Sequence, residues 1–204
     1  MTLKTTPTYE GLLRPYVMNR SLHPPQLWLL LALRGPERRA RFVTEVAAEH
    51  GLVTATLHRA GRMLSEAGFV VRSKAKGPTM DRRGKVKLTA SAMRAMLGSE
   101  ADQDRVMRVM HEIMASPYPG LSLRQVWLLF WLNEPQPEEP RTASSAASII
   151  GMDRAVTWRA AAALERLSLI ERVPTAGRTQ PLKLSAEGTA LINQILEQVE
   201  RESA

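Results

Sequence analysis

The sequence contains no cysteine, which excludes disulfide bonds and thiolate metal sites. It has four histidines, and they show no metal-ligand spacing: His23, His50, His58 and His111. No glycine-rich phosphate loop, metal-ligand cluster or nucleophile motif is visible either. We therefore expect a protein that is not an enzyme and that carries no cofactor or metal ion.

Long hydrophobic runs are also missing. The longest, residues 27–33, is far shorter than the about 20 apolar residues that a membrane-spanning helix needs. No signal peptide is visible, because Lys4, Glu10 and Arg14 fall near the start of the chain. These observations predict a cytoplasmic protein, associated with the nucleoid, that has no membrane partner.

The composition is that of a globular protein, with 44% apolar and 24% charged residues in 204 positions. Its net charge of +8 is unevenly distributed. Residues 1–100 hold 17 Lys and Arg against 7 Asp and Glu, a balance of +10, whereas residues 101–204 hold 11 against 13, a balance of −2. The first half therefore has the charge of a nucleic-acid-binding domain, and the second half is near neutral.

Residues 51–89 change from a helical to an extended pattern. Gly61 and Leu64 lie within about 40° of Leu57 when successive residues are about 100° apart, so these three residues form one buried helix face. Three residues point away from that face: Arg59, Arg62 and, less centrally, His58. Gly68 and the apolar run after it predict a reversal, a strand, a hairpin and a second strand.

The predicted hairpin is strongly basic, and five of its residues are candidates for phosphate contacts: Lys74, Lys76, Arg82, Arg83 and Lys85. A helix over residues 42–50 precedes the arginine-bearing helix and ends at Gly51, a plausible left-handed cap. The order is therefore helix, turn, helix and hairpin. Proteins that place a helix in the major groove of duplex DNA and a basic hairpin on its backbone have this order. For this segment alone, an amphipathic helix with a solvated charged face is the alternative.

The same elements recur about a hundred residues later. Three groups of residues carry the repeat: Gln26-Leu27-Trp28-Leu29-Leu30 with Gln125-Val126-Trp127-Leu128-Leu129, then Gly51, Arg59, Leu64 and Arg72 with Gly151, Arg159, Leu164 and Arg172, and finally Leu88-Thr89 with Leu184-Ser185. The offsets of 99, 100 and 96 residues fit a duplicated domain rather than a solenoid with repeats of about 20–50 residues. We expect one domain over residues 1–98 and another over residues 99–204, with Trp28 and Trp127 as matching core anchors.

The second copy differs from the first where DNA would be touched. Its second helix, over residues 153–167, presents Arg154, Trp158 and Arg159. The matching helix of the first copy presents a different set: Thr54, Thr56, His58, Arg59 and Arg62. The hairpin of the second copy holds two scattered cations: Arg178 and Lys183. Trp158 could touch a thymine methyl group or a sugar, or it could fill a contact between domains.

The pattern resembles the MarR family of winged helix-turn-helix transcription regulators. The family signature is a leucine, a glycine, two apolar residues and an arginine at the exit of the recognition helix, then an Asp-x-Arg wing before a Leu-Thr pair. The first copy supplies Leu64, Gly68, Phe69, Val70 and Arg72, then Asp81, Arg83, Leu88 and Thr89. The second copy has Ser168 for the glycine, lacks the Asp-x-Arg, and supplies Leu164, Leu169, Ile170, Arg172, Leu184, Ser185 and Gly188. The resemblance covers roughly residues 22–97 and 121–200.

Members of that family are usually homodimers joined by their terminal helices, so a chain with two copies resembles a dimer made covalent. The resemblance implies a mainly α-helical fold with small β wings. In this fold, two tandem winged helix-turn-helix domains pack as a pseudo-dimer through terminal and linking helices. It also implies a monomer with an internal pseudo-twofold axis, for which further self-association stays open, and a small-molecule effector that no residue here identifies.

The expected partner is double-stranded DNA, and the expected function is sequence-specific transcription regulation. Recognition helices would enter adjacent major grooves about 34–36 Å apart, with the basic wing on phosphates. Because the two copies differ, the DNA site would be asymmetric. Two other hypotheses stay open: a plasmid or phage replication initiator that binds origin repeats, and a winged-helix protein-interaction scaffold.

Overall fold

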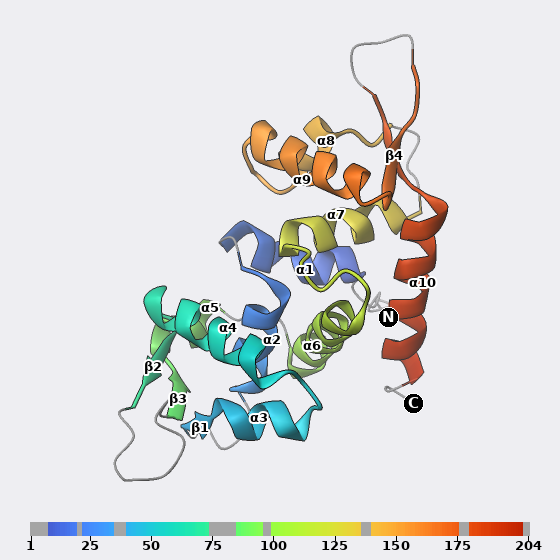
Figure 1. Cartoon of the computed structure of the whole chain (residues 1–204). Helices are drawn as coiled ribbons and strands as arrows, with labels where there is room; N and C mark the ends of the chain where they lie inside the picture. Colours follow the sequence, from blue (N-terminus) through green and yellow to red (C-terminus); the bar gives the residue numbers. More distant parts are fainter. Residues whose placement is uncertain are drawn as a thin grey trace, which may run out of the picture. The chain divides into compact units, whose positions relative to one another are not determined.

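The computed structural model describes residues 8–19, 22–34, 40–73, 85–95, 99–135, 140–175 and 180–201. Most of these residues are helical, and the described strands form one three-stranded and one two-stranded antiparallel sheet (Figure 1). The expectation of a mainly α-helical chain with small β hairpins is confirmed. No helix in the described ranges is long and apolar enough to cross a lipid bilayer.

The chain forms two compact units whose limits differ from the expected domains 1–98 and 99–204. The central unit comprises residues 23–114, and the terminal unit comprises residues 1–22 and 115–204. Helix α1 (Tyr9–Asn19) therefore belongs with the second repeat, and α6 (Glu100–Ala115) belongs with the first. The physical reason is that a helix before a repeat joins whichever core buries its apolar side, and chain order does not decide this.

The compact units also differ in charge from the two halves of the sequence. The central unit holds 16 Lys and Arg against 9 Asp and Glu, a balance of +7. The terminal unit holds 12 against 11, a balance of +1 rather than the −2 expected for residues 101–204. The central unit remains the more basic of the two.

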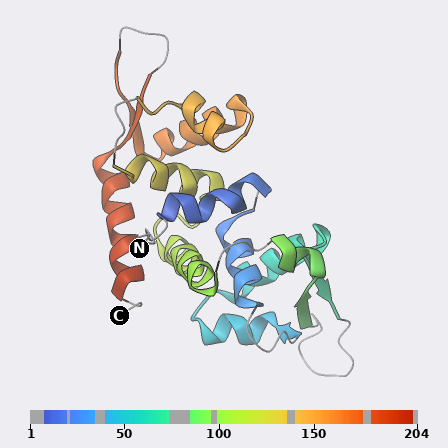
Figure 2. The ribbon, with the colours of Figure 1, turned by 180° about the vertical axis from the view of Figure 1, so that it is seen from behind.

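The central unit is built around α2 (Pro24–Ala32), which is buried on most sides as expected. The other elements follow in order: β1 (Arg41–Phe42), α3 (Val43–Glu49), α4 (Thr54–Glu66), β2 (Val70–Arg72), β3 (Lys85–Leu88), α5 (Ala90–Ala95) and α6. Helix α4 packs against α2 and α3, and the sheet has the strand order β1, β3, β2 (Figure 2). Val70 pairs with Leu88, and Arg41 pairs with Val86.

The terminal unit repeats this plan around α7 (Leu123–Asn133). Its further elements are α8 (Ala143–Ile149), α9 (Arg154–Arg166), β4 (Ile170–Arg172), β5 (Leu182–Leu184) and α10 (Ala186–Arg201). Ile170 pairs with Leu184 across the hairpin, and the Leu182 N–H donates to the Arg141 carbonyl at 2.6 Å. That last hydrogen bond stands where β1 pairs with β3 in the central unit. Trp127 is fully buried, and Trp28 of the central unit nearly so, which confirms both as core anchors.

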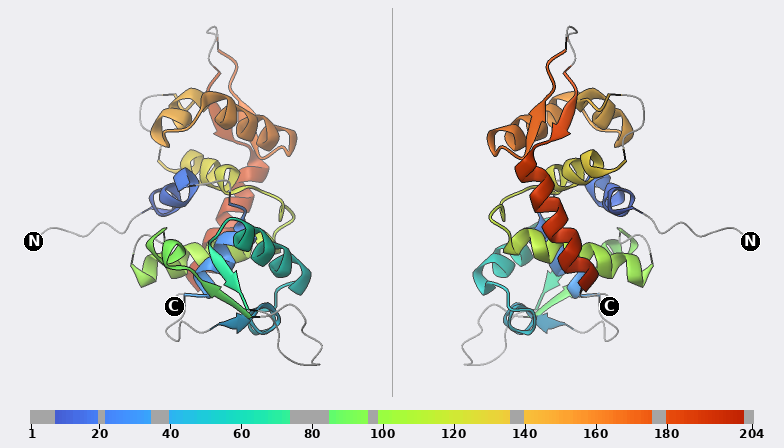
Figure 3. Two further views of the ribbon diagram at one scale, coloured as in Figure 1. Left: turned by 90° about the vertical axis from the view of Figure 1, so that its left-hand side faces the viewer. Right: turned by 90° about the vertical axis from the view of Figure 1, so that its right-hand side faces the viewer.

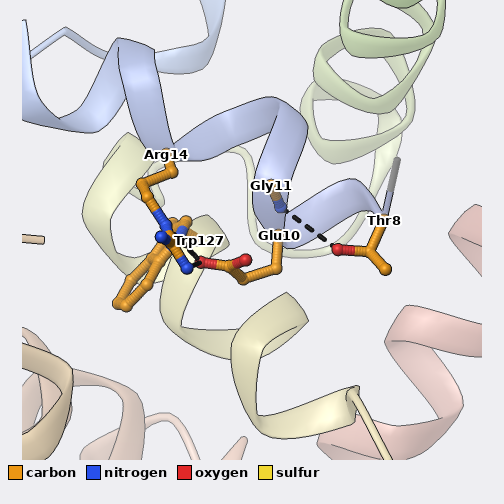
Figure 4. Close-up of polar contacts among 5 residues, drawn as sticks. All are labelled: Thr8, Glu10, Gly11, Arg14 and Trp127. Atoms are coloured by element: carbon orange, nitrogen blue, oxygen red, sulfur yellow. Dashed lines mark hydrogen bonds and ion pairs between the residues drawn. The ribbon is translucent and has the colours of Figure 1, made fainter. Parts of the chain in front are cut away.

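A buried polar contact holds α1 against α7. Glu10 is 7% exposed, and its Oε1 accepts a hydrogen bond of 3.0 Å from the Trp127 indole N–H (Figure 4). Arg14, one turn further along α1, forms an ion pair of 2.9 Å with the same oxygen. The ring of Tyr9 lies 5.5 Å from that of Phe130. Both views of Figure 3 accordingly show α1 beside α7.

The turns of the two repeats match in backbone conformation. Gly51 and Gly151, which follow α3 and α8, have φ angles of 63° and 61°. The next amide groups donate to matching carbonyls, Leu52 to Ala47 at 2.9 Å and Met152 to Ala147 at 3.0 Å. The sequence repeat therefore corresponds to a repeat of local structure. The left-handed cap predicted at Gly51 is confirmed.

Candidate nucleic-acid interface

Helix α4 has the predicted orientation in the central unit. Leu57, Gly61 and Leu64 are buried, and α4 packs on α2 through this face. Three of the five candidate residues on α4 are exposed: Thr56, Arg59 and Arg62. The other two are partly buried: Thr54 and His58. The arginines cannot be part of the core, because the opposite side of the helix already fills it.

Three hydrogen bonds connect the C-terminal end of α4 to the two strands that follow it. Gly68 has a φ of 76°, and the following Phe69 N–H donates to the Leu64 carbonyl at 2.9 Å. After β3 the chain returns to the end of α4, where Thr89 Oγ1 donates to the Gly68 carbonyl at 3.0 Å. The Thr89 N–H also donates to the Phe69 carbonyl at 3.0 Å. These hydrogen bonds therefore hold the end of α4 next to the described ends of β2 and β3 within the central unit.

The described part of the first hairpin presents lysines on one side. In β3, Lys85 and Lys87 are exposed while Val86 between them is fully buried. The Lys85 ammonium lies 5.0 Å from the centre of the Phe42 ring. Lys87 was not among the sequence candidates, although alternation along the strand could have identified it. Four predicted hairpin residues lie outside the described residues: Lys74, Lys76, Arg82 and Arg83.

The cross-strand neighbours distinguish the two hairpins electrostatically. Lys87 pairs with Val71, which is exposed and uncharged. At the matching point of the terminal unit, Lys183 pairs with Glu171, and their charged groups are 2.8 Å apart. The Lys183 ammonium therefore lies beside a carboxylate in an exposed pair, whereas Lys87 has no acidic cross-strand neighbour. The candidate Arg178 lies outside the described residues.

Helix α9 repeats the orientation of α4 in the terminal unit. Thr157, Ala161 and Leu164 are buried. The three candidate residues on α9 are all exposed: Arg154, Trp158 and Arg159. The N-caps of the two helices differ. Val53 before α4 makes no side-chain hydrogen bond, whereas the Asp153 carboxylate before α9 accepts from the Ala155 N–H at 2.6 Å. The exposed side of α9 is thus locally positive although its unit is near neutral.

Two cations of the terminal unit that sequence reasoning missed lie at or near α9. Arg166 is exposed in its last turn. The guanidinium of Arg172, from β4, lies 5.6 Å from the centre of the Trp158 ring. Arg172 also forms an ion pair of 2.9 Å with Glu165. Helical spacing could have identified Arg166. The contact between Arg172 and Trp158 depends on the direction that the chain takes from α9 into β4.

Near the turn between α3 and α4, His50 is neutral and Glu49 is paired, whereas Arg62 on α4 keeps most of its charge exposed. Burial lowers the pKa of His50, whose ring meets that of Trp28 edge-on at 5.0 Å, so this histidine is uncharged at neutral pH. Arg41 bonds the Glu49 carboxylate and lowers its pKa. Arg62 lies 3.9 Å from Glu66, but both side chains are well exposed, so their attraction is weak.

The described residues include a small apolar cavity but no cluster of metal-ligating side chains. No group of three or more acidic, histidine or cysteine side chains among them could hold a metal ion. A cavity of about 250 Å³ lies in the central unit, lined by Leu33, Lys87, Leu88 and Met93. Its lining is mainly apolar.

No protein-family model matches the sequence, and no curated protein matches it. Among solved structures, the crystal structure of RV1404 from Mycobacterium tuberculosis is similar to part of the chain, with 23% sequence identity and a TM-score of 0.44. The similarity covers 50% of this chain and 68% of that protein. A match at this level does not establish a shared fold.

Proposed function

We propose that the protein is a sequence-specific double-stranded DNA-binding transcription regulator with two winged helix-turn-helix domains of the MarR type. One observation carries the proposal. In both units, a helix, a turn, a second helix and a hairpin follow one another, and the second helix buries its small and apolar face while exposing arginines. An amphipathic helix with a solvated charged face would explain one such segment, but it gives no reason for the same order of elements in both units.

The chemistry of the exposed groups fits duplex DNA. An arginine on a helix in the major groove can donate two hydrogen bonds to O6 and N7 of guanine, and Arg59 and Arg154 have the exposure that this requires. Lysines on an adjacent hairpin bind phosphates without reading sequence, and Lys85 and Lys87 are candidates for that role. The balance of +7 in the central unit supports its larger share of the electrostatic attraction.

The two units would read different half-sites. Arg59 and Arg62 face outwards from α4, whereas Arg154, Trp158 and Arg159 face outwards from α9. Because both helices belong to one chain, the second contact is intramolecular once the first has formed. A weaker terminal unit can therefore still add affinity, and the preferred site is an asymmetric pair of half-sites.

Selection of bound duplexes from a random pool, followed by titration of the selected duplex, tests this proposal. Arg59→Ala should weaken binding by about 1–3 kcal/mol if that arginine reads a guanine edge. Arg201→Ala is the matched control, since Arg201 is also exposed but lies at the end of α10, and it should change affinity little. Equal losses of affinity for both variants would mean that Arg59 contributes only general positive charge and does not read a base.

The same selection separates the other two hypotheses. Enrichment of several copies of one short sequence, as in an origin of replication, would favour an initiator over a regulator. A chain without measurable affinity for any duplex at low salt would be a protein-interaction scaffold. The exposed arginines on both α4 and α9 suit duplex DNA, because guanidinium groups can donate hydrogen bonds to phosphates and to guanine edges.

A further inference from the structure

Trp158 is the exception among the tryptophans of this chain, all four of which lie in the described residues. Its relative exposure is 55%, whereas those of Trp28, Trp127 and Trp131 are at most 7%. Large aromatic side chains at the surface of a folded unit lose hydrophobic stabilisation unless something covers them. Trp158 lies in the middle of α9, on the side that also exposes Arg154 and Arg159.

The ring of Trp158 is held by its own unit. The Arg172 guanidinium lies 5.6 Å from the ring centre, a cation–π distance. Arg172 is itself held by Glu165, at 2.9 Å between Nε and the carboxylate. A side chain supported in this way loses little conformational freedom when a ligand covers it. The Arg172 guanidinium therefore supports the ring from within its own unit, while more than half of the Trp158 side chain stays exposed.

We infer that Trp158 contacts the C5 methyl group of a thymine in the major groove and thereby gives the terminal unit its sequence preference. The inference rests on the proposed function, since it requires α9 to enter duplex DNA. Thymine is the base whose major-groove edge carries an apolar group, and the indole ring is the largest apolar side chain that α9 exposes.

The neighbouring arginine refines the predicted sequence. Arg154 lies four residues before Trp158, so the two side chains lie on the same face of α9, about 6 Å apart along its axis. Stacked base pairs are about 3.4 Å apart, so the two contacts should fall about two base pairs from each other. A guanine contacted by Arg154 and a thymine contacted by Trp158 would then form one short recognition element.

The contact should be confined to one half-site. In the central unit, the matching position holds His58, which is partly buried and less apolar. A contact between an indole ring and a thymine methyl group is therefore expected only in the half-site of the terminal unit. The thymine should therefore lie in the half-site that the terminal unit binds.

Replacement of thymine by uracil in the selected duplex tests the inference, because it removes the methyl group and keeps every hydrogen-bonding group. Each thymine is replaced in turn, and the affinities of the full chain, Trp158→Ala and Trp158→Phe are measured. For the full chain, uracil at one position should weaken binding about fourfold. This equals the about 0.8 kcal/mol that burying one methyl group contributes. Trp158→Ala should lose the discrimination at that position, and Trp158→Phe should keep part of it.

Fluorescence gives a second measurement on the same complex. Acrylamide quenches exposed tryptophan, so quenching in this chain reports mainly on Trp158. Addition of the thymine-containing duplex should reduce the quenching. Unchanged quenching in the complex, or equal affinity of the full chain for all uracil-containing duplexes, would overturn the inference while leaving DNA binding intact. Absence of binding to any duplex would instead overturn the proposed function itself.

Discussion

Ser168 adopts in the terminal unit the left-handed backbone conformation that Gly68 adopts in the central unit, with φ angles of 58° and 76°. Each residue follows its exposed helix, α4 or α9, and each carbonyl accepts from a hydroxyl at the end of the hairpin, Thr89 or Ser185. Ser168 has the one positive φ outside glycine in the described residues. A residue with a side chain is strained in this conformation, whereas glycine is not.

Ser168→Gly should therefore stabilise the protein. Relief of about 1–2 kcal/mol of left-handed strain exceeds the about 0.4–1 kcal/mol that a more flexible unfolded chain costs, which leaves a gain of about 0.5 kcal/mol. Gly68→Ala is the reciprocal variant and should destabilise by about 1–2 kcal/mol. No atom lies within 4 Å of the position that a Cβ at Gly68 would take, so sterics alone cannot explain a loss there. Urea unfolding checks both, and a less stable Ser168→Gly protein would contradict this account.

Gly188 in α10 is required for a different reason, which is close packing. A Cβ atom there would lie 1.9 Å from the Leu169 carbonyl oxygen. Gly188→Ala must displace backbone and should lower the free energy of unfolding by about 1–3 kcal/mol. Gly120→Ala is the control, because nothing lies within 4 Å of its Cβ position. Thermal unfolding of the two variants would show similar midpoints if the close approach at Leu169 were not real.

The Glu10–Trp127 hydrogen bond should hold α1 in the terminal unit. Glu10→Ala leaves the buried Trp127 N–H without its acceptor, which should cost about 1–3 kcal/mol of stability. The cost should be smaller in a Trp127→Phe background, which a double-mutant cycle measures. Arg14→Ala should cost less than about 1 kcal/mol, because the Arg14 side chain is 43% exposed. Additive effects of the Glu10 and Trp127 changes would mean that the two residues do not interact.

Lys87 and Lys183 occupy matching positions, but only Lys183 pairs with a cross-strand glutamate. In titrations of DNA binding against salt concentration, Lys85→Ala and Lys87→Ala should each flatten the logarithmic slope by about one unit. Lys183→Ala should flatten the slope less, because the Glu171 carboxylate lies 2.8 Å from the Lys183 ammonium. A steep slope that survives both central-unit changes would place the first hairpin away from DNA.

The sequence was sufficient for features that depend on local spacing. Gly51 and Gly68 were predicted from turn chemistry, and the buried face of α4 from the spacing of Leu57 and Leu64; all are confirmed. Membership of α1 in the terminal unit could not be predicted, because it depends on a contact between residues 117 positions apart. The Arg172–Trp158 contact was missed for a similar reason, since it needs the exit direction of β4. The DNA-binding roles of all candidate residues stay predictions, and five of them lie outside the described residues: Lys74, Lys76, Arg82, Arg83 and Arg178.

Hydroxyl-radical footprinting of the selected duplex tests the central claim most directly. The full chain should protect two segments about one helical turn apart, with unequal sequences. Removal of Arg154 and Arg159 together should erase one segment, and removal of Arg59 and Arg62 should erase the other and weaken binding more. A single protected segment that is lost equally with either pair of substitutions would contradict the account of two unequal DNA-reading units in one chain.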